Sequence, residues 1–314
     1  MEGGRAMDRG DGDGSNDGPT LDPAMVSPDT ISGVATPASF ADLAQSFDIP
    51  LSDTQIRRFD AYRSMLLSWN QRTNLTAVTD PAEVDRRLFL DSILLLSALD
   101  AALQLMDARP GRMIDVGSGA GFPGLPLKIM RPDLDITLVE ATGKKVAFLD
   151  ACIVDLGLEH IVTIHGRAED LGHDPGYRER FDIVTARAVA SLPALLELGL
   201  PFLHPGGRGL FPKGLDIAEE LSAATAAAPL VGGRIVATRP LPGGQTTLVA
   251  VAKTGPTPRT YPRRAGIPAR EPLGHLDRSI HDQSARIARA NSRDRTNRPD
   301  RPPTDRPAAA RGTS

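Results

Sequence analysis

The residues best suited to chemistry stand together in one segment, Asp115-Val-Gly-Ser-Gly-Ala-Gly-Phe-Pro-Gly124. An apolar run precedes these glycines and a helical pattern follows them. Glycines let the backbone approach a ligand closely, and the first turn of a helix offers free N–H groups. The segment therefore predicts a ligand-binding loop between a strand and a helix.

Two glycine spacings fit this loop. Gly119, Gly121 and Gly124 match the G-x-G-x-x-G pattern of dinucleotide-binding loops. Gly117, Gly119 and Gly121 instead form G-x-G-x-G, two residues after Asp115. The second spacing fits better because it begins directly at the strand end and has an acid ahead of it, a feature of S-adenosylmethionine sites. S-adenosylmethionine has no pyrophosphate, so its loop does not need the phosphate-binding geometry.

Glu140 ends the next apolar run, Thr137-Leu-Val-Glu140. A carboxylate at this place can accept hydrogen bonds from both ribose hydroxyls of an adenosine. That contact serves a nicotinamide cofactor equally well, so Glu140 predicts a bound adenosyl group without separating the two cofactors.

Three further polar groups follow later strands and are expected at the same sheet edge. Gly166-Arg-Ala-Glu169 follows the third strand, and Glu169 suits either the adenine amino group or the start of a helix, whose dipole favours an acid. Arg187 closes the fourth strand and Lys213 the fifth. Arg187 suits the cofactor or a substrate phosphate.

Several catalytic devices are missing from the sequence. No Asn/Asp-Pro-Pro-aromatic motif, which positions exocyclic amino groups, follows the fourth strand. The single cysteine, Cys152, falls inside a predicted amphipathic helix, where cysteine is usually core. The six histidines show no ligand spacing, so no metal site is expected. These absences favour a methyl acceptor that needs no general base, such as guanine N7, whose lone pair is free.

The elements that must position these groups can be read from the apolar pattern. Ser52 opens a helix with the Ser-x-x-Gln55 spacing of a capping box, and a second helical stretch covers about Pro81 to Leu99. After Pro110, short apolar runs alternate with helical segments, which predicts a parallel sheet covered on both faces. The seven expected strands are Met113–Val116, Thr137–Val139, Ile161–Ile164, Ile183–Ala186, Gly209–Phe211, Ile235–Ala237 and Leu248–Val251. Helices are expected near Gly124–Met130, Lys144–Leu156, Glu169–Leu171 and Leu192–Leu200, whereas Gly243-Gly244 indicates an antiparallel hairpin before the last strand.

Composition and the apolar pattern divide the chain into four segments. Residues 1–38 are acidic and Gly-rich, with seven acids and two arginines, and are expected to be disordered. Residues 39–110 form an N-terminal helical cap, and residues 111–274 form the cofactor-binding core with a C-terminal extension. Residues 275–314 form an Arg/Pro-rich tail that is expected to be mostly disordered and that could attract nucleic acid.

The beginning of the sequence has no apolar core of a secretory signal, and Ile93 to Leu99, the longest strongly apolar stretch, is too short to cross a bilayer. We therefore expect a cytoplasmic protein that is not bound to a membrane.

Taken together, these motifs resemble the GidB (glucose-inhibited division protein B) family of bacterial guanine-N7 methyltransferases of small-subunit ribosomal RNA. The resemblance covers about Phe40 to Gly274. It rests on the glycine loop extended to Pro126 and on the following further segments: Asn74-Leu-Thr76, Arg87-x-x-Leu-Asp-Ser92, Gly143-Lys-Lys145 with Phe148-Leu149, Arg167-Ala-Glu169, Arg187-Ala-Val-Ala-Ser191, Lys213-Gly214 and Tyr261-Pro-Arg-Arg-Ala-Gly-Ile-Pro268. The glycine loop joined to the Arg-Ala-x-Ala-Ser segment is the specific part.

The resemblance implies a class I methyltransferase-like fold, a doubly wound seven-stranded α/β sheet with an N-terminal helical cap. It implies S-adenosylmethionine as methyl donor, no metal, and transfer to N7 of a guanine in a loop of 16S rRNA near the decoding site, within the small ribosomal subunit or its precursor. We expect a monomer. The implied cofactor contacts are Gly117, Phe122, Ala168, Glu169 and Arg187, with Asp115, Gly119 and Glu140 assisting. Arg167, Lys213, Asn74 and Asp91 are substrate-side candidates, and no residue is assigned as a catalytic acid or base.

Three other activities fit parts of the pattern. A small-molecule or protein methyltransferase could use the same fold, because fold does not determine substrate. A nicotinamide-dependent oxidoreductase would use the Gly119-Gly121-Gly124 spacing. A non-catalytic RNA-binding module would retain RNA binding when Glu140 or Gly117 is replaced. The acidic core domain fits RNA binding only if basic residues such as Arg86, Arg87, Arg131, Arg167, Arg187 and Lys213 gather on one face.

Overall fold

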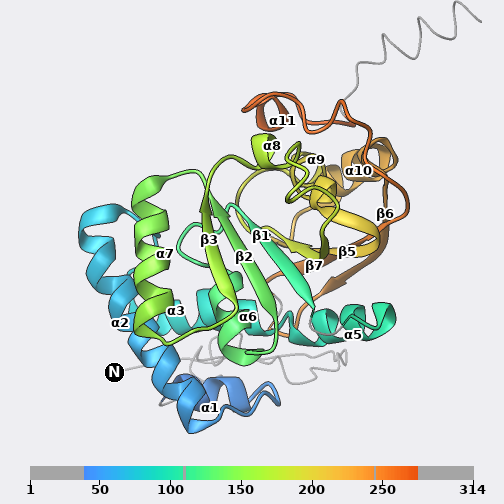
Figure 1. Ribbon diagram of the computed structural model, residues 1–314. Helices are drawn as coiled ribbons and strands as arrows, with labels where there is room; N and C mark the ends of the chain where they lie inside the picture. Colours follow the sequence, from blue (N-terminus) through green and yellow to red (C-terminus); the bar gives the residue numbers. More distant parts are fainter. Residues whose placement is uncertain (1–38, 109–110, 244, 275–314) are drawn as a thin grey trace, which may run out of the picture. The chain divides into compact units, whose positions relative to one another are not determined.

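The computed structural model describes residues 39–108, 111–243 and 245–274. The predictions for residues 1–38 and for the tail 275–314 fall outside the described residues. Figure 1 shows the described part, in which helices surround a central sheet.

The sheet contains all seven expected strands. Their order is β3-β2-β1-β4-β5-β7-β6, with β1 to β5 parallel and β7 antiparallel to both of its neighbours. The antiparallel hairpin expected from Gly243-Gly244 is therefore confirmed as the β6–β7 pair. The strands are β1 (Arg112–Val116), β2 (Asp135–Glu140), β3 (Ile161–His165), β4 (Phe181–Thr185), β5 (Leu203–Lys213), β6 (Gly233–Pro240) and β7 (Thr247–Lys253).

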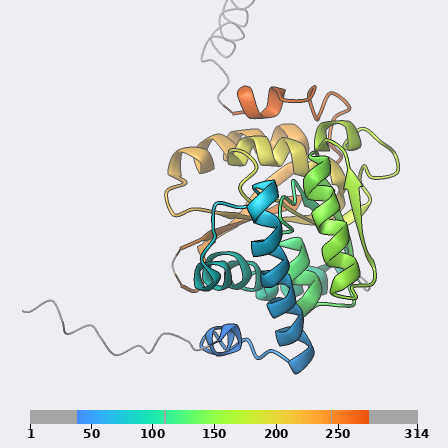
Figure 2. The same cartoon turned by 90° about the vertical axis from the view of Figure 1, so that its left-hand side faces the viewer.

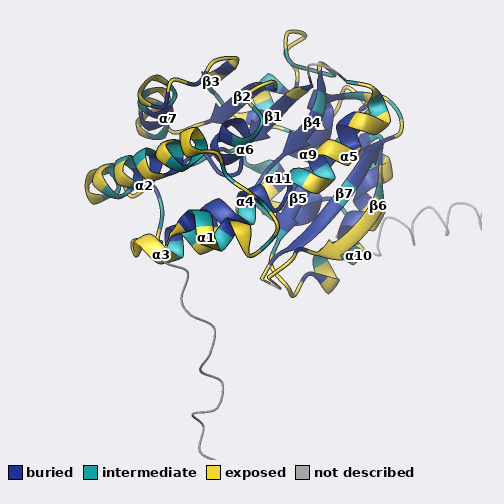
Figure 3. Cartoon of the chain, turned by 90° about the horizontal axis from the view of Figure 1, so that it is seen from below, coloured by how far each residue is buried: buried dark blue, intermediate teal, exposed yellow. Residues whose placement is uncertain are grey.

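Alternating side chains of the central strands enter two separate cores. On β1, Met113 belongs to one hydrophobic cluster and Ile114 to the other. On β4, Ile183 and Val184 divide in the same way. Because the side chains of a strand alternate between faces, this division shows that both faces of the sheet are covered by helices. The doubly wound α/β fold is confirmed, and Figure 3 shows the strands in the buried colour between helices with exposed outer faces.

The helices divide between the two faces. Those preceding β1 and those following β1 and β2 share the first core, and α9 and α10 fill the second. The helices are α1 (Phe40–Gln45), α2 (Asp53–Thr73), α3 (Pro81–Val84), the π-helical η1 (Asp85–Leu90), α4 (Asp91–Ile93), α5 (Leu96–Met106), α6 (Gly124–Met130), α7 (Gly143–Asp155), α8 (Ala168–Leu171), α9 (Leu192–Gly199), η2 (Leu200–Phe202), α10 (Ala218–Ala227), η3 (Ala228–Val231) and α11 (Ile267–Arg270). Of these, α1, α10 and α11 were not anticipated from the sequence.

The helix α2 begins as predicted. The Ser52 hydroxyl accepts from the Gln55 amide while the Gln55 side chain accepts from the Ser52 amide, so the capping box is complete. In Figure 2, α2 lies beside α7 along much of its length. Phe59, Tyr62 and Leu66 form its buried face.

The second helical stretch extends further than the sequence suggested. It runs from Pro81 to Met106, and by length and composition this stretch is long and apolar enough to span a membrane, contrary to the sequence-based estimate. Its apolar side chains are used inside the fold, because 56% of its most apolar window is buried. Phe89, Ile93 and Leu99 are completely enclosed in the first core. Burial therefore accounts for its composition.

Seven aromatic rings join the N-terminal helices to the glycine loop. Tyr62 stacks against both Phe89 and Phe122, with ring centroids 5.2 and 5.5 Å away. The contacts continue to Phe40, Phe59, Phe148 and Trp69. Since the chain has only thirteen aromatic residues, more than half of them serve this junction. The N-terminal helices thus fix the loop that follows β1.

Candidate functional site

The glycine loop leaves the carboxyl end of β1 in a conformation that requires glycine. Gly117, Gly119 and Gly121 have φ angles of +70°, +59° and +97°, where a side chain would be strained. The Gly117 amide donates to the carbonyl of Val139 at 2.8 Å, so the loop is tied to the end of β2. The Tyr62 hydroxyl donates to the carbonyl of Ala120 from the other side.

Asp115 is completely buried beneath this loop. Its Oδ2 accepts from the Gly124 amide at 3.2 Å, whereas its Oδ1 has no hydrogen-bond partner within the described chain. Burial raises the pKa of Asp115 from 3.8 to about 7, a rise that the Gly124 amide only partly opposes. The structure therefore holds one buried carboxylate oxygen without a partner at the carboxyl end of β1.

Glu140 shapes the site from the end of β2. Its Oε2 accepts from the Gly119 amide at 3.0 Å and its Oε1 from the Thr142 amide at 2.8 Å. Each carboxylate oxygen has a second lone pair, so Glu140 can still accept from hydroxyl groups while it holds both loops. The predicted ribose-binding acid thus lies directly against the glycine loop.

Phe122 lies in the loop after β1, and Ala168 follows β3. Phe122 is only 8% exposed and stacks on Tyr62, so its ring mainly belongs to the aromatic junction. Ala168 is buried and opens α8 after β3. Arg167, directly before it, is exposed at the same sheet edge.

Glu169 points toward the C-terminal part of the chain. Its Oε1 accepts from the Gly266 amide at 2.8 Å. Glu169 also lines a hollow of about 520 Å³ between α8 and the segment around Arg263. One of its oxygens is therefore engaged by the protein itself.

Arg187 and Asp91 were predicted separately, and the structure brings them together. An Arg187 Nη2 atom lies 3.4 Å from the Asp91 carboxylate and donates to the carbonyl of Arg87. The same Asp91 oxygen accepts from the Thr246 hydroxyl at 3.0 Å. Burial lowers the pKa of Arg187 and raises that of Asp91. The Arg187 Nη1 atom is buried without a partner in the described chain.

Lys213 has partners within the protein, and Asn74 occupies the end of a helix. The Lys213 ammonium lies 2.8 Å from Glu220 and 3.1 Å from the carbonyl of Ala190, and only 12% of its side chain is exposed. It therefore holds the loop after β4. Asn74 is exposed and ends α2 in the left-handed conformation, at φ 50°, which is a helix-capping position.

The basic residues named from the sequence do not all share one edge. Arg131 follows α6 at the amino end of β2, where it pairs with Asp100 and Asp133. Arg167 and Arg187 instead follow β3 and β4 at the carboxyl edge. Arg131 therefore does not belong to a patch around the glycine loop.

Ser191, the last residue of the Arg-Ala-x-Ala-Ser segment, is a further candidate for the site. It stands at the N-cap of α9, yet its hydroxyl makes no capping hydrogen bond and is buried without a partner in the described chain. The first amide of the helix, that of Leu192, donates to Glu220 instead. The available signal was Pro193, which cannot donate the hydrogen bond that a capping serine often accepts.

Neither a reactive cysteine nor a metal cluster is found among the described residues. Cys152 is buried in α7 and burial raises its pKa, so its thiol stays protonated. Residues 39–108, 111–243 and 245–274 contain no group of three His, Cys, Asp or Glu side chains arranged to hold a metal ion.

Comparison with known proteins gives close matches over most of the chain. A family model described as GidB, rRNA small subunit methyltransferase G, matches residues 55–246, more than half of the chain. The chain is 47% identical to the ribosomal RNA small subunit methyltransferase G of Roseiflexus castenholzii over 234 residues, which are 74% of this chain and 97% of that protein. It is 42% identical to the protein of the same name from Lactococcus lactis over 241 residues, 76% of this chain and 99% of that protein. A crystal structure of an MtNAS mutant with S-adenosylmethionine is 18% identical, covers 63% of this chain and 75% of that chain, and has a TM-score of 0.43, too distant to support an argument about ligands.

Proposed function

We propose a specific reaction for this site from the premise that the chain belongs to the GidB family, rRNA small subunit methyltransferase G. It is an S-adenosylmethionine-dependent methyltransferase of small-subunit ribosomal RNA. Beyond that, we infer that the acceptor is N7 of a guanine in a loop of 16S rRNA near the decoding site. The protein would act in the cytoplasm, as a monomer and without a metal, on the small ribosomal subunit or its precursor.

One observation carries the assignment of the site. Among the described residues, three buried side-chain atoms lack hydrogen-bond partners: Asp115 Oδ1, Arg187 Nη1 and Ser191 Oγ. They come from the ends of β1 and β4 and from the loop after β4, all at the carboxyl edge of the sheet. Buried polar groups are almost always paired, so a cluster of unpaired ones at a ligand edge indicates groups that await a ligand.

The types of these groups suit S-adenosylmethionine. Asp115 supplies an acceptor for an ammonium group, and Arg187 supplies a donor for a carboxylate. Glu140 supplies a carboxylate for the ribose diol beside Gly119. The amino-acid end and the ribose of the cofactor would thus each meet a complementary group, with Ala168 and Glu169 at the adenine end.

The cofactor, when bound, supplies an electrophilic methyl group on a sulfonium. The protein then has to bring the acceptor into line and exclude water. Guanine N7 has a free lone pair, so no proton leaves and no general base is needed. The rate enhancement would come mainly from proximity and orientation, which can supply roughly 7–11 kcal/mol.

The acceptor base must stand outside a regular RNA helix to reach this site. The major groove of A-form RNA, where N7 lies, is deep and narrow, so the target would be a loop or flipped nucleotide. Arg167, exposed next to Ala168, is our candidate for a phosphate contact. Asp91 is a candidate for shaping the acceptor side because it holds Arg187. Asn74 remains a substrate-side candidate at the end of α2.

The proposal is tested by incubating the purified protein with methyl-labelled S-adenosylmethionine and small ribosomal subunits that lack their methylations. The RNA is then digested and the labelled nucleoside identified by mass spectrometry. We expect 7-methylguanosine. Label in another nucleoside would overturn the N7 assignment. Label absent from the RNA, with cofactor still bound in calorimetry, would favour a small-molecule or protein acceptor. Binding of NAD without binding of S-adenosylmethionine would exclude the assigned cofactor.

A further inference from the structure

The last described segment, residues 257–274, is called the strap here. It follows β7 and crosses α8, α9 and α10, and it carries the short helix α11, which lies beside α8 (Figure 1). The family model ends at residue 246, before the strap, but the strap includes Tyr261–Pro268, one of the segments on which the resemblance to the family rests. Leu273 is buried in the second core near its end. Its other attachments are largely polar.

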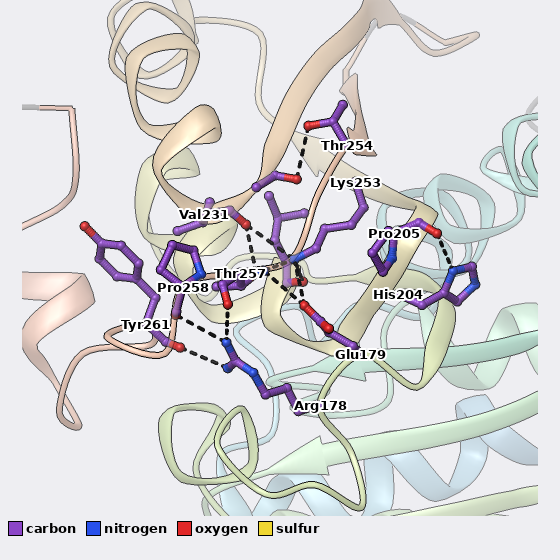
Figure 4. A network of polar contacts seen from close by, with 12 residues as sticks. Arg178, Glu179, His204, Pro205, Val231, Lys253, Thr254, Thr257, Pro258 and Tyr261 are labelled. Carbon is purple, nitrogen blue, oxygen red and sulfur yellow. Dashed lines mark hydrogen bonds and ion pairs between the residues drawn. The ribbon is translucent and has the colours of Figure 1, made fainter.

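Arg178 fastens the first half of the strap. Its guanidinium donates to the carbonyls of Thr257 and Tyr261, at 2.6 and 3.0 Å, and to that of Pro258 at 3.2 Å. It also donates to the carbonyl of Gly172, at the end of α8, at 2.6 Å. Figure 4 shows this fork reaching Thr257, Pro258 and Tyr261. One side chain therefore ties the strap to α8.

The network around Arg178 is half-buried and densely paired. Glu179 accepts from the Thr257 amide at 3.0 Å and lies 3.9 Å from the Lys253 ammonium. The fully enclosed Lys253 also donates to the carbonyl of Leu200 at 2.9 Å, and its burial lowers its pKa to about 8. These contacts place the start of the strap at a defined position relative to the sheet (Figure 4).

Arg263 fastens the second half of the strap. It makes a two-pronged ion pair with Glu197 of α9, with Nε and Nη2 at 2.9 and 2.7 Å from the two carboxylate oxygens. The Arg263 amide donates to the same carboxylate at 2.7 Å. Since the Glu197 side chain is completely buried, this pair is specific in geometry and costly to separate.

The strap also contacts α8 directly, on either side of Arg263. His173 Nε2 lies 2.7 Å from the carbonyl of Pro262, and the Gly266 amide donates to Glu169 at 2.8 Å. Gly172 is so close to Pro262 that an added Cβ would lie 2.6 Å from the proline Cγ. The strap therefore packs against the α8 region and holds the Glu169 carboxylate through the Gly266 amide.

We propose that the strap positions Glu169 for S-adenosylmethionine, so that Arg178 and Arg263 are positioning residues for cofactor binding although neither contacts the cofactor. This inference rests on the proposed cofactor site. Its physical basis is that Glu169 sits on a four-residue helix, too short to hold its own orientation without tertiary contacts.

The test compares Arg178→Met, Arg178→Lys and Gly172→Ala with the wild type in full-length protein. Calorimetry measures the Kd for S-adenosylmethionine and thermal unfolding measures Tm. Arg178→Met removes the guanidinium that joins the strap to α8. Gly172→Ala adds a methyl group that pushes Pro262 of the strap away from α8 and changes no charge. We expect each of these to raise the Kd about tenfold, equivalent to about 1.4 kcal/mol. Arg178→Lys keeps one cationic donor group and should recover part of the affinity.

Arg131→Met is the matched control. It likewise replaces an arginine by methionine, but this arginine pairs with Asp100 and Asp133 at the amino edge of the sheet. We expect it to lower Tm and leave the Kd unchanged.

A double-mutant cycle with Glu169→Ala shows whether the strap acts through Glu169. In that background, Arg178→Met should change the Kd by less than twofold, because the positioned group is already absent. Equal effects of Arg178→Met in both backgrounds, or wild-type affinity in both Arg178→Met and Gly172→Ala, would overturn the inference. If the wild type itself binds no S-adenosylmethionine, the proposed function fails before the strap is tested.

Discussion

Replacing Asp115 by asparagine should stabilise the ligand-free protein in a pH-dependent way. Burial raises the pKa of Asp115 from 3.8 to about 7. Between these values the folded chain holds a proton that the unfolded chain has released, so this group makes stability fall as pH rises from about 4 to 7. A pKa rise of this size corresponds to about 4 kcal/mol at pH 8. The side-chain amide of the Asp115→Asn variant cannot ionise and should avoid this cost.

The stability difference between Asp115→Asn and the wild type can be measured between pH 5 and pH 8. From pH 5 to pH 8, the stability difference between Asp115→Asn and the wild type should grow by roughly 2 to 3 kcal/mol. The nearby Glu140 adds to the rise in the pKa of Asp115, whereas Arg187 and the Gly124 amide oppose it. Urea unfolding at each pH measures the free energy of unfolding, and only the difference between the two proteins is used, so that other titrating groups cancel.

The affinity of the wild type for S-adenosylmethionine should rise with pH, whereas the contribution of Asp115 to stability falls. An ionised Asp115 attracts the ammonium and sulfonium charges of S-adenosylmethionine, so wild-type affinity should rise with pH up to about 7 and binding should release a proton below it. Calorimetry in two buffers of different ionisation enthalpy counts that proton. Asp115→Asn should bind more weakly at pH 8 and release no proton.

Asp133→Asn is a suitable control because Arg131 lowers the pKa of Asp133. It should therefore lose stability at neutral pH. The reasoning about Asp115 would be refuted if its asparagine variant showed a stability difference from wild type that stays constant within about 0.5 kcal/mol from pH 5 to 8.

Three further predictions concern the loops around the site. Gly117→Arg should abolish S-adenosylmethionine binding while the circular dichroism spectrum stays native. The reason is that Gly117 has a φ of +70° and that a Cβ there would lie 2.5 Å from a Val189 methyl. Retained methyl transfer would show that the loop is wrongly assigned. Lys213→Met should lower kcat/KM about tenfold by releasing the loop that Lys213 and Glu220 hold, and should leave the salt dependence of rRNA binding unchanged. If the slope of log K for rRNA binding against log salt concentration fell by about one, Lys213 would instead contact an RNA phosphate, as the sequence suggested. Tyr62→Phe should cost about 1–3 kcal/mol in urea unfolding, since it leaves a buried carbonyl of the glycine loop without its donor; an unchanged midpoint would contradict this.

Local sequence information was sufficient for the order of strands and helices in the core. Strands such as Met113–Val116 are short apolar runs bounded by turns, and α2 begins with a self-contained capping box. The glycine loop was also recognisable, because a backbone at positive φ allows few residues other than glycine. Alanine-rich α10 lacked a comparable signal, since alanine favours helices without marking a buried face.

The identity of each partner was decided only by the tertiary structure. Arg187 pairs with Asp91 from 96 residues away, and Gly266 reaches Glu169 from 97 residues away. Lys213 was a substrate-side candidate from the sequence, and the structure shows it as a mostly buried anchor. Periodicity and turn residues depend on neighbours within a few positions and can be read from the chain. The partner of a charge, and whether water reaches it, depends on which distant elements pack together, and that is settled only when the two cores form.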